Sequence, residues 1–199
     1  MPAGALANAN VGMRVGVLAL QGDFREHLQA VERLGARGVE VRRPWDLEGV
    51  ERLIIPGGES TAISLLLRES GLDEELRRLG RAGLPLFGTC AGLILLAREV
   101  LGEDRVAPLG LIDITVRRNA YGRQIESFEE DLEVKGLGPT PLRAVFIRAP
   151  KIVAFGPRVE VLAYQDGLPV LAREGKVLVS SFHPELTGDL RLHRYFLGL

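Results

Sequence analysis

The 199-residue sequence predicts an α/β protein built on a flavodoxin-like, doubly wound and mostly parallel sheet. In its first half, short apolar runs alternate with amphipathic segments, which is the pattern of buried parallel strands joined by helices. In its second half, strand-like runs follow one another across Gly and Pro turns, which predicts antiparallel strands added to the sheet. No repeat or linker divides the chain, so we expect a single domain over residues 13–199.

The first half begins with a short leader. Residues 1–12 are small and weakly patterned, so we expect them to be disordered or left over from cloning. The strands expected after the leader are 14–20, 39–41, 53–55 and 84–87. The helices expected beside them are 24–34, 60–71, a segment after residue 73, and 93–100. Ser60 or Thr61 is suited to cap the second helix, because a hydroxyl accepts hydrogen bonds from first-turn amides.

The second half is richer in strands than in helices. The strands expected there are 111–116, 132–134, 144–147, 159–163, 170–172 and 177–181. A short amphipathic helix over residues 190–197 is expected to close the chain.

Composition and charge exclude several classes of function. Lysine and arginine total 25 and acidic residues total 26, so the net charge is −1 and there is no basic excess for binding nucleic acid. No apolar run approaches the roughly 20 residues that cross a bilayer, and residues 1–10 lack the features of a signal peptide. A single cysteine cannot form an internal disulfide. We therefore expect a cytoplasmic protein with no nucleic-acid or membrane partner.

Cys90 lies in a Gly-x-Cys-x-Gly pattern between an expected strand and an expected helix. This is the cysteine form of a nucleophile elbow, in which the glycines leave room for a sharp turn. The turn would expose the thiol near a helix N-terminus, whose positive potential favours the thiolate. The amide of Ala91 would be free to bind an oxyanion, because first-turn amides have no partner within the helix. The alternative is a buried structural cysteine beside a glycine-rich turn.

His183 and Glu185 follow the last expected strand, in the sequence Ser-Phe-His-Pro-Glu. Residues two apart on extended backbone point the same way, and the intervening proline biases His183 to be extended. The carboxylate would then fix the tautomer of a histidine base. The alternative is an unrelated pair on the surface. His27 and His193 fall in expected helices, where surface or packing roles are the common case.

A glycine-rich segment, Pro-Gly-Gly-Glu-Ser over residues 56–60, follows the strand 53–55. Its glycines allow positive φ and close approach to a ligand, although such loops also bind phosphate or only turn the chain. The segment and the two motifs around Cys90 and His183 all follow expected strands. The carboxyl ends of parallel strands gather at one edge of a doubly wound sheet, where ligands bind.

Taken together, these motifs resemble class I, triad-type glutamine amidotransferases. Within that class the sequence is most similar to the glutaminase subunits of pyridoxal 5′-phosphate synthase. The matching stretches lie at residues 17–22, 56–61, 87–93, 118–128, 146–150 and 181–187, in the order typical of that family. Residues 118–128 are the most discriminating stretch, because general glutaminases share only the triad motifs.

The resemblance implies a role for each matching residue. It implies a catalytic triad of Cys90, His183 and Glu185 and an oxyanion hole at Gly58 and Ala91. The implied glutamine contacts are Gly58, Glu59, Ser60, Arg118, Ile147 and Arg148. It also implies a partner, a β/α-barrel synthase subunit that makes pyridoxal 5′-phosphate with the ammonia released from L-glutamine. No cofactor and no metal are implied for the glutaminase itself.

Other functions remain open at this point. The chain could serve another ammonia-using synthase, such as one making imidazole glycerol phosphate, because the triad motifs are shared. It could be a different cysteine hydrolase on a similar sheet, which glutamine specificity would test. It could also be a non-catalytic regulatory subunit that senses redox state through Cys90, in which case no partner would elicit turnover.

Overall fold

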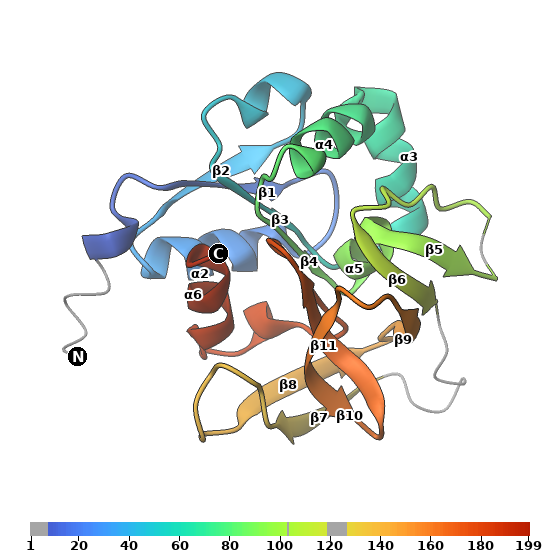
Figure 1. The fold of residues 1–199 in the computed structure, drawn as a ribbon. Coiled ribbons are helices and arrows are strands. Elements are labelled where there is room, and N and C mark those ends of the chain that lie inside the picture. Colours follow the sequence, from blue (N-terminus) through green and yellow to red (C-terminus); the bar gives the residue numbers. More distant parts are fainter. Residues whose placement is uncertain (1–7, 103, 119–126) are drawn as a thin grey trace.

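The computed structural model describes residues 8–102, 104–118 and 127–199. Its largest sheet has seven strands, which are β1 (Arg14–Leu18), β2 (Arg37–Val41), β3 (Arg52–Ile55), β4 (Leu86–Thr89), β10 (Glu160–Gln165), β11 (Leu168–Glu174) and β12 (Val177–Ser180). They lie side by side in the order β10-β11-β12-β4-β3-β1-β2 (Figure 1). Strands β12, β4, β3, β1 and β2 are parallel to one another, whereas β10 and β11 pair in antiparallel fashion.

The order of the parallel strands identifies the topology. From one edge it runs β2-β1-β3-β4-β12, which is the flavodoxin-like order with β12 as the fifth strand. The predicted fold class, a doubly wound and mostly parallel sheet with antiparallel additions, is therefore confirmed.

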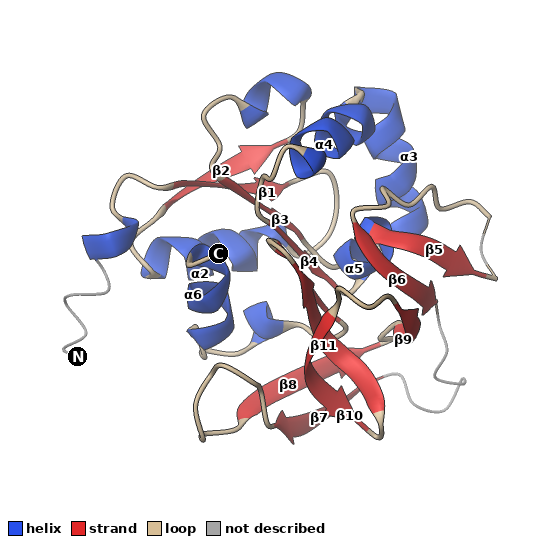
Figure 2. Ribbon diagram, viewed as in Figure 1, coloured by secondary structure: helices blue, strands red, loops and turns tan. Residues whose placement is uncertain are grey.

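Helices cover both faces of this sheet (Figure 2). The α-helices of the described residues are α2 (Phe24–Arg33), α3 (Ser60–Ser70), α4 (Leu72–Arg81), α5 (Ala91–Leu96) and α6 (Arg191–Leu197). Helices α2 and α6 lie on one face, and α3, α4 and α5 lie on the other (Figure 1). Successive residues of a strand serve the two cores in turn: Leu53 and Ile55 pack on the α3 side, and Ile54 packs on the α2 side. This is why the buried strands read as continuous apolar runs.

Two smaller sheets stand beside the large one. Strands β5 (Ala97–Leu101), β6 (Ile112–Arg117) and β9 (Lys151–Phe155) form the first, and β7 (Ser127–Leu132) and β8 (Leu142–Ile147) form an antiparallel hairpin. The hairpin packs through Phe146, whose ring stacks on Phe128 with centroids 4.6 Å apart and lies 5.7 Å from the ring of Phe182. This packing places the end of β8 beside the residues that follow β12.

One sequence prediction of local structure was wrong, and one strand was missed. The helix expected over residues 93–100 ends at Leu96, because the following residues pair with β6 as strand β5. Strand β9 was not anticipated. The second-half strands of the large sheet are β10, β11 and β12, whereas the smaller sheets take up the other second-half strands. These differences concern pairing between distant segments, which a local pattern does not contain.

The cap of helix α3 also differs from expectation. Glu59 is its N-cap, and the carboxylate accepts hydrogen bonds from the amides of Thr61 (3.2 Å) and Ala62 (2.7 Å). Ser60 and Thr61, the expected caps, lie within the first turn. The helix ends as predicted at Gly71, which has a positive φ of 76°.

The described end of the leader touches the domain. Asn8–Asn10 forms one turn of 3-10 helix, η1, and the side-chain amide of Asn10 donates to the Leu34 carbonyl oxygen over 2.9 Å. Two further 3-10 turns are η2 (Pro44–Leu47) and η3 (Pro184–Leu186). Residues 1–7 and 119–126, which include most of the discriminating stretch 118–128, lie outside the described residues.

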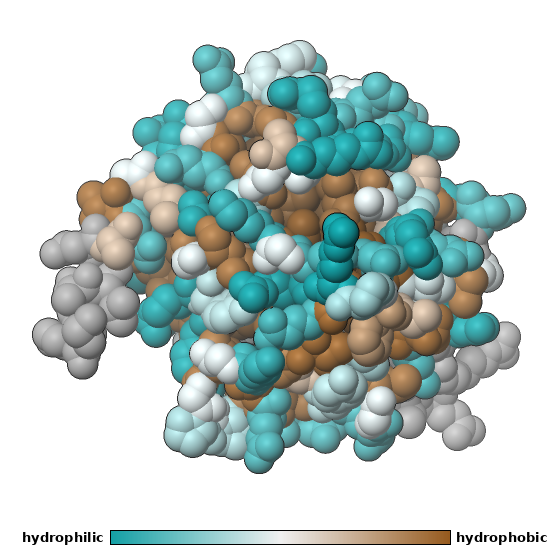
Figure 3. Space-filling view, viewed as in Figure 1, coloured by the Kyte–Doolittle hydropathy of each residue, from teal (hydrophilic) through white to brown (hydrophobic). Residues whose placement is uncertain are grey.

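Figure 3 shows the surface of the face seen in Figure 1. Polar side chains predominate over α3 and α4, whereas hydrophobic atoms appear lower down, over β10 and β11. Tyr164 of β10 is among the exposed large hydrophobic residues, as are Val153 and Phe155 of β9. Among the helices of the described ranges, none has the length and apolar character that a bilayer crossing requires.

Candidate active site

A cavity of about 510 Å³ opens where β1, β3, β4 and β12 end at one edge of the sheet. It contains nearly all the residues singled out in the sequence. The lining residues are Asp23, Gly58, Glu59, Ser60, Cys90, Ala91, Ile94, Arg118, Ile147, Arg148 and His183. Glu185 is buried next to His183 without lining the cavity. A larger hollow of about 800 Å³, between β7 and β10, has no cysteine or histidine in its lining and offers no comparable chemistry.

Cys90 occupies the turn between β4 and α5 with φ 51° and ψ −102°. This strained conformation of a non-glycine residue is typical of a nucleophile elbow. Only glycine fits at the flanking positions, because a Cβ on Gly88 would lie 2.5 Å from the Gly92 carbonyl oxygen and one on Gly92 would lie 2.0 Å from that of Ile55. The Cys90 amide donates to the Ser180 carbonyl oxygen over 2.8 Å, which ties the turn to β12.

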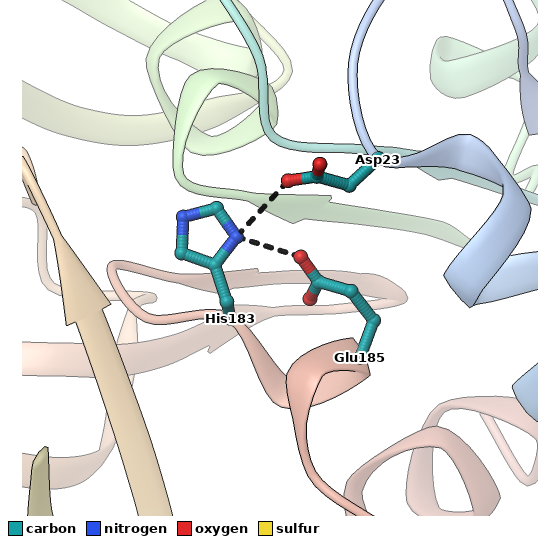
Figure 4. A group of neighbouring side chains, drawn as sticks. All are labelled: Asp23, His183 and Glu185. Carbon is teal, nitrogen blue, oxygen red and sulfur yellow. Dashed lines mark hydrogen bonds and ion pairs between the residues drawn. The ribbon is translucent and has the colours of Figure 1, made fainter.

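His183, in the wall of the cavity, forms a close pair with Glu185 (Figure 4). The His183 Nδ1 atom lies 2.6 Å from Glu185 Oε1. The backbone between them is not the extended chain that the sequence suggested, since Pro184 begins the 3-10 turn η3. This turn, rather than strand alternation, directs the carboxylate at the ring. The His183 amide donates to the Val145 carbonyl oxygen of β8 over 2.9 Å, which fixes the histidine backbone.

Electrostatics favour a charged His183. Burial disfavours its imidazolium form, but hydrogen bonds to Cys90 and Glu185 and the negative charge on both outweigh burial and raise the pKa of His183 to about 10. Burial raises the pKa of Glu185, an effect that the hydrogen bond from His183 and its positive charge oppose. A charged histidine beside a cysteine is arranged to protonate a leaving group.

Asp23 is a second carboxylate at this histidine, and the sequence analysis did not identify it. Its Oδ2 lies 3.5 Å from His183 Nδ1 (Figure 4). Burial raises the pKa of Asp23, while the charge of His183 lowers it. Asp23 ends the loop that joins β1 to α2, so its position near the carboxyl edge of the sheet was the signal that could have revealed it.

The loop after β3 packs tightly against the loop after β1. A Cβ on Gly57 would lie 2.5 Å from His183 Cε1, and a Cβ on Gly58 would lie 2.4 Å from Gln21 Oε1. Neither glycine is among the described residues with positive φ. Close approach, and not the positive φ considered for these residues, therefore explains the glycines. The Glu59 amide donates to Gln21 Oε1 over 2.8 Å, which connects the two loops.

Arg118 and the start of α3 form a polar wall of the cavity. Arg118 Nη1 donates to Thr61 Oγ1 over 2.5 Å and to Ser60 Oγ over 3.1 Å, and it lies 3.5 Å from Glu59 Oε1. Burial raises the pKa of Glu59, but hydrogen bonds from the Ala62 and Thr61 amides and the charge of Arg118 lower it more. Glu59 thus remains an anion beside an arginine, a pair suited to the two charged ends of an amino acid.

The opposite wall comes from the end of β8. The Ile147 carbonyl oxygen lies 3.8 Å from Cys90 Sγ, and Arg148 is exposed with a positive φ of 45°. The structure therefore brings Arg118 and Arg148 to the same cavity from different segments of the chain.

One group of side chains in the described ranges has the composition of a metal site. Ligand atoms of Asp23, His183 and Glu185 all lie within 4.8 Å of one another. The 2.6 Å contact between His183 Nδ1 and Glu185 Oε1 is, however, a hydrogen-bond distance, and the ring proton that makes it occupies the nitrogen a metal would need. The arrangement is better suited to orienting a histidine than to holding an ion.

Two further histidines are buried in this region, His27 beside Glu185 and His193 against His27. They are 0% and 1% exposed, so of the surface or packing roles expected for them, a surface role is excluded. The sequence offered one weak signal for this arrangement. His27 falls on the buried side of α2 together with Val31, four residues later.

The fold and the cavity at the sheet edge define a class I glutamine amidotransferase architecture. The structure is similar to a crystal structure of a glutamine amidotransferase, with a TM-score of 0.88 and 58% identity over 92% of this chain and 97% of that one. It also resembles PurLQS from Thermotoga maritima, with a TM-score of 0.69 over 94% of this chain and 98% of that one; at 17% identity this shows the fold alone.

Sequence comparison gives the family. The chain is 63% identical to the pyridoxal 5′-phosphate synthase subunit PdxT of Thermus thermophilus, over 93% of this chain and 96% of the relative. It is 60% identical to the protein of that name from Pelotomaculum thermopropionicum, over 93% and 94% respectively. The profile of the SNO glutamine amidotransferase family matches residues 17–198. The chain belongs to the SNO glutamine amidotransferase family, and the resemblance stated from its motifs is confirmed.

Proposed function

We propose that this chain is the glutaminase subunit of a pyridoxal 5′-phosphate synthase. It hydrolyses L-glutamine to L-glutamate and ammonia and delivers the ammonia to a synthase subunit. One observation carries the proposal: a single cavity brings the Cys90 thiol, His183 and a cation–anion pair for an amino acid to the edge of the sheet. The family supports glutamine as the substrate, and the names of the relatives support this synthase over another ammonia-using enzyme.

The reaction is an acyl transfer through a thioester. The Cys90 thiolate attacks the side-chain amide carbon of glutamine, and the carbonyl electron pair moves onto oxygen. The amides of Gly58 and Ala91 stabilise this oxyanion. His183 gives its proton to the nitrogen as the C–N bond breaks, which releases ammonia and leaves a γ-glutamyl thioester. Water then attacks the thioester, His183 removes its proton, and collapse releases glutamate and the thiolate.

Glutamine recognition uses the two walls of the cavity. Arg118 and Arg148 bind the α-carboxylate, because a guanidinium offers forked donors to a carboxylate. Glu59, held as an anion at the start of α3, accepts the α-ammonium group. Ser60 and the backbone at Ile147 complete the contacts. Glu185 does not touch glutamine and acts by orienting the His183 ring.

The partner is a β/α-barrel synthase subunit that docks over the cavity. Ammonia released into bulk water would be protonated and lose its nucleophilicity, so a closed path into a docked partner is expected. We place this reaction in the cytoplasm, where a single free thiol stays reduced.

The test is glutamate release by the chain with and without the synthase subunit. Cys90→Ala should abolish turnover while the thermal unfolding temperature stays near that of the wild type. A glutamine-like electrophile should label Cys90, and glutamine should protect it. Turnover near wild type in the Cys90→Ala variant removes Cys90 from the mechanism, and absence of turnover with any partner favours a non-catalytic thiol subunit.

A further inference from the structure

Two buried histidines that the proposed reaction does not use extend the polar network beyond Glu185. His27 Nε2 lies 3.4 Å from Glu185 Oε2 and 3.2 Å from Thr89 Oγ1. On the other side of its ring, His27 Nδ1 lies 2.9 Å from His193 Nε2. A line of side chains therefore runs from His183 through Glu185 and His27 to His193, linking η3 to helices α2 and α6.

Both additional histidines are neutral. Burial, followed by the charges of His193 and His183, lowers the pKa of His27 well below its usual value. Burial lowers the pKa of His193 to about 4. Near neutral pH each ring therefore carries one proton, and the nitrogen that holds it decides what the ring can donate.

The geometry selects one arrangement of these protons. With the His27 proton on Nε2, the N–H donates to Thr89 Oγ1 with its positive end beside the Glu185 carboxylate, and Nδ1 accepts from the Nε2–H of His193. With the proton on Nδ1, Nε2 would accept from the Thr89 hydroxyl, and its lone pair would lie beside the Glu185 Oε2 lone pairs. His193 would then accept at Nε2 and carry its proton on Nδ1, which is buried and has no partner in the described part of the chain. An unpaired buried N–H is rarer than an unpaired acceptor, so the first arrangement is favoured.

Glu185 needs such a donor. Its Oε1 is held by His183, but Oε2 is buried and has no hydrogen bond among the described atoms. The Glu185 amide and the charges of His183 and Asp23 act on this carboxylate, and His27 Nε2 approaches Oε2 to 3.4 Å. At this distance the N–H stabilises the negative charge electrostatically, without a close hydrogen bond, and the low dielectric of the interior strengthens that effect.

We propose that His27 is a positioning residue for the glutaminase reaction: its neutral Nε2–H keeps Glu185 ionised and aimed at His183, and His193 fixes the His27 tautomer. The inference rests on the proposed function. It differs from a packing role, which the edge contact of the His27 ring with Phe87 would also serve, because packing alone does not act on the charge of Glu185.

The experiment measures glutamate release against pH for the chain saturated with its synthase subunit. His27→Leu removes the donor, whereas His27→Gln keeps an N–H at the position of Nε2. The titratable groups facing Glu185 are His183, Asp23 and His27, and those facing His27 are Glu185, His183 and His193. Loss of the N–H raises the pKa of Glu185, so the acidic limb of the kcat profile should move to higher pH.

For His27→Leu we expect kcat to fall about tenfold or more with KM little changed, as for other partners that orient a reacting group. The acidic limb should move up by as much as about one pH unit, because a buried carboxylate loses the dipole that stabilises its charged form. His27→Gln should restore most of the lost kcat and return the acidic limb most of the way to its wild-type position. His193→Leu should give a smaller shift in the same direction, because His27 keeps its donor but loses the partner that fixes it.

Val31→Ala is the matched control, because Val31 is fully buried on the same helix and outside the network. It should lower the unfolding temperature without moving the acidic limb. The inference is overturned if the acidic limb of the kcat profile does not move in His27→Leu and His193→Leu. It is also overturned if that limb moves as far in His27→Gln as in His27→Leu. If His27→Leu does not fold, nitrogen NMR of the wild-type chain identifies which ring nitrogen of His27 carries the proton. An unprotonated Nε2 would contradict the inference. Absence of turnover in the wild-type complex would instead count against the proposed function.

Discussion

The two ring nitrogens of His183 have separate tasks. Nδ1 is held by Glu185, with Asp23 nearby, and this leaves Nε2 for the cysteine and the leaving group. A carboxylate that only orients the ring should matter less than the ring itself. The chemistry therefore predicts an order of effects within the triad.

His183→Asn should reduce kcat more than Glu185→Gln, because the histidine moves two protons in each cycle. A positioned acid–base group typically supplies about 10²–10⁴-fold in rate. Glu185→Gln keeps a side chain of the same shape and should retain more activity. Steady-state kinetics of the complex with its synthase subunit would measure both variants. Equal and small losses would contradict the triad assignment.

Arg118→Ala and Arg148→Ala should weaken glutamine binding and leave the thiol reactive. A charge-assisted hydrogen bond removed from each site corresponds to a KM increase of roughly tenfold or more. Arg143→Ala is the control, since that arginine of β8 is exposed and pairs with Glu129 and Asp131 away from the cavity. Labelling of Cys90 by a small electrophile without an amino-acid group should be unchanged in all three variants. An unchanged KM for both cavity arginines would reject this role.

Among the secondary-structure elements, those closest to the chemistry were the most predictable. The β4–α5 turn, the loop after β3 and the end of β12 each combine a local apolar run with glycine or proline, so sequence alone placed Cys90, Gly58 and His183 at one edge. The β7–β8 hairpin and the sheet of β5, β6 and β9 depend on pairing between distant segments. Asp23 and His27 were missed because their signals, a place after a strand and a place on the buried side of a helix, do not identify the residues that they meet.

The leader provides a separate test. Deleting residues 1–12 should leave glutaminase activity and partner binding unchanged, since the matching stretches begin at residue 17. It should lower the free energy of unfolding by about 1 kcal/mol, because the hydrogen bond from the Asn10 side chain to the Leu34 carbonyl oxygen is lost. Asn10→Ala in the full chain should reproduce that loss. Urea unfolding and steady-state kinetics would measure both effects, and a large loss of activity on deletion would mean that the leader docks on the partner or the site.

For the assembled enzyme, turnover should depend on the partner, because an uncoupled glutaminase would waste glutamine. We place this control in the loops after β1 and β3. The Glu59 amide is bonded to Gln21, and the Gly57 carbonyl oxygen accepts from the Asp23 amide over 3.0 Å. Docking that rearranges these contacts would change which donors face an oxyanion, and one missing donor costs about 10²–10³ in rate.

Turnover of the chain alone and of the chain saturated with synthase subunit would test this dependence. If the two rates agree within about twofold, or ~0.5 kcal/mol of transition-state stabilisation, the partner does not activate the glutaminase. Gly58→Ala should remove most of the activation without preventing docking, because its Cβ would lie 2.4 Å from Gln21 Oε1. Gly188→Ala is the matched control, since an added Cβ there meets nothing within 4 Å.

The β7–β8 hairpin has a consequence for the lifetime of the competent site. It forms a sheet of its own, yet the Val145 carbonyl oxygen holds the His183 amide and the Ile147 carbonyl oxygen contacts Cys90. A hairpin can open locally at a lower free energy than the unfolding of a central sheet. Activity should therefore be lost on heating before the core melts, with the β8 amides exchanging with solvent earlier than those of β3 and β4. The thermal limit of the enzyme would then be set at its periphery, and a partner bound against the hairpin would raise it.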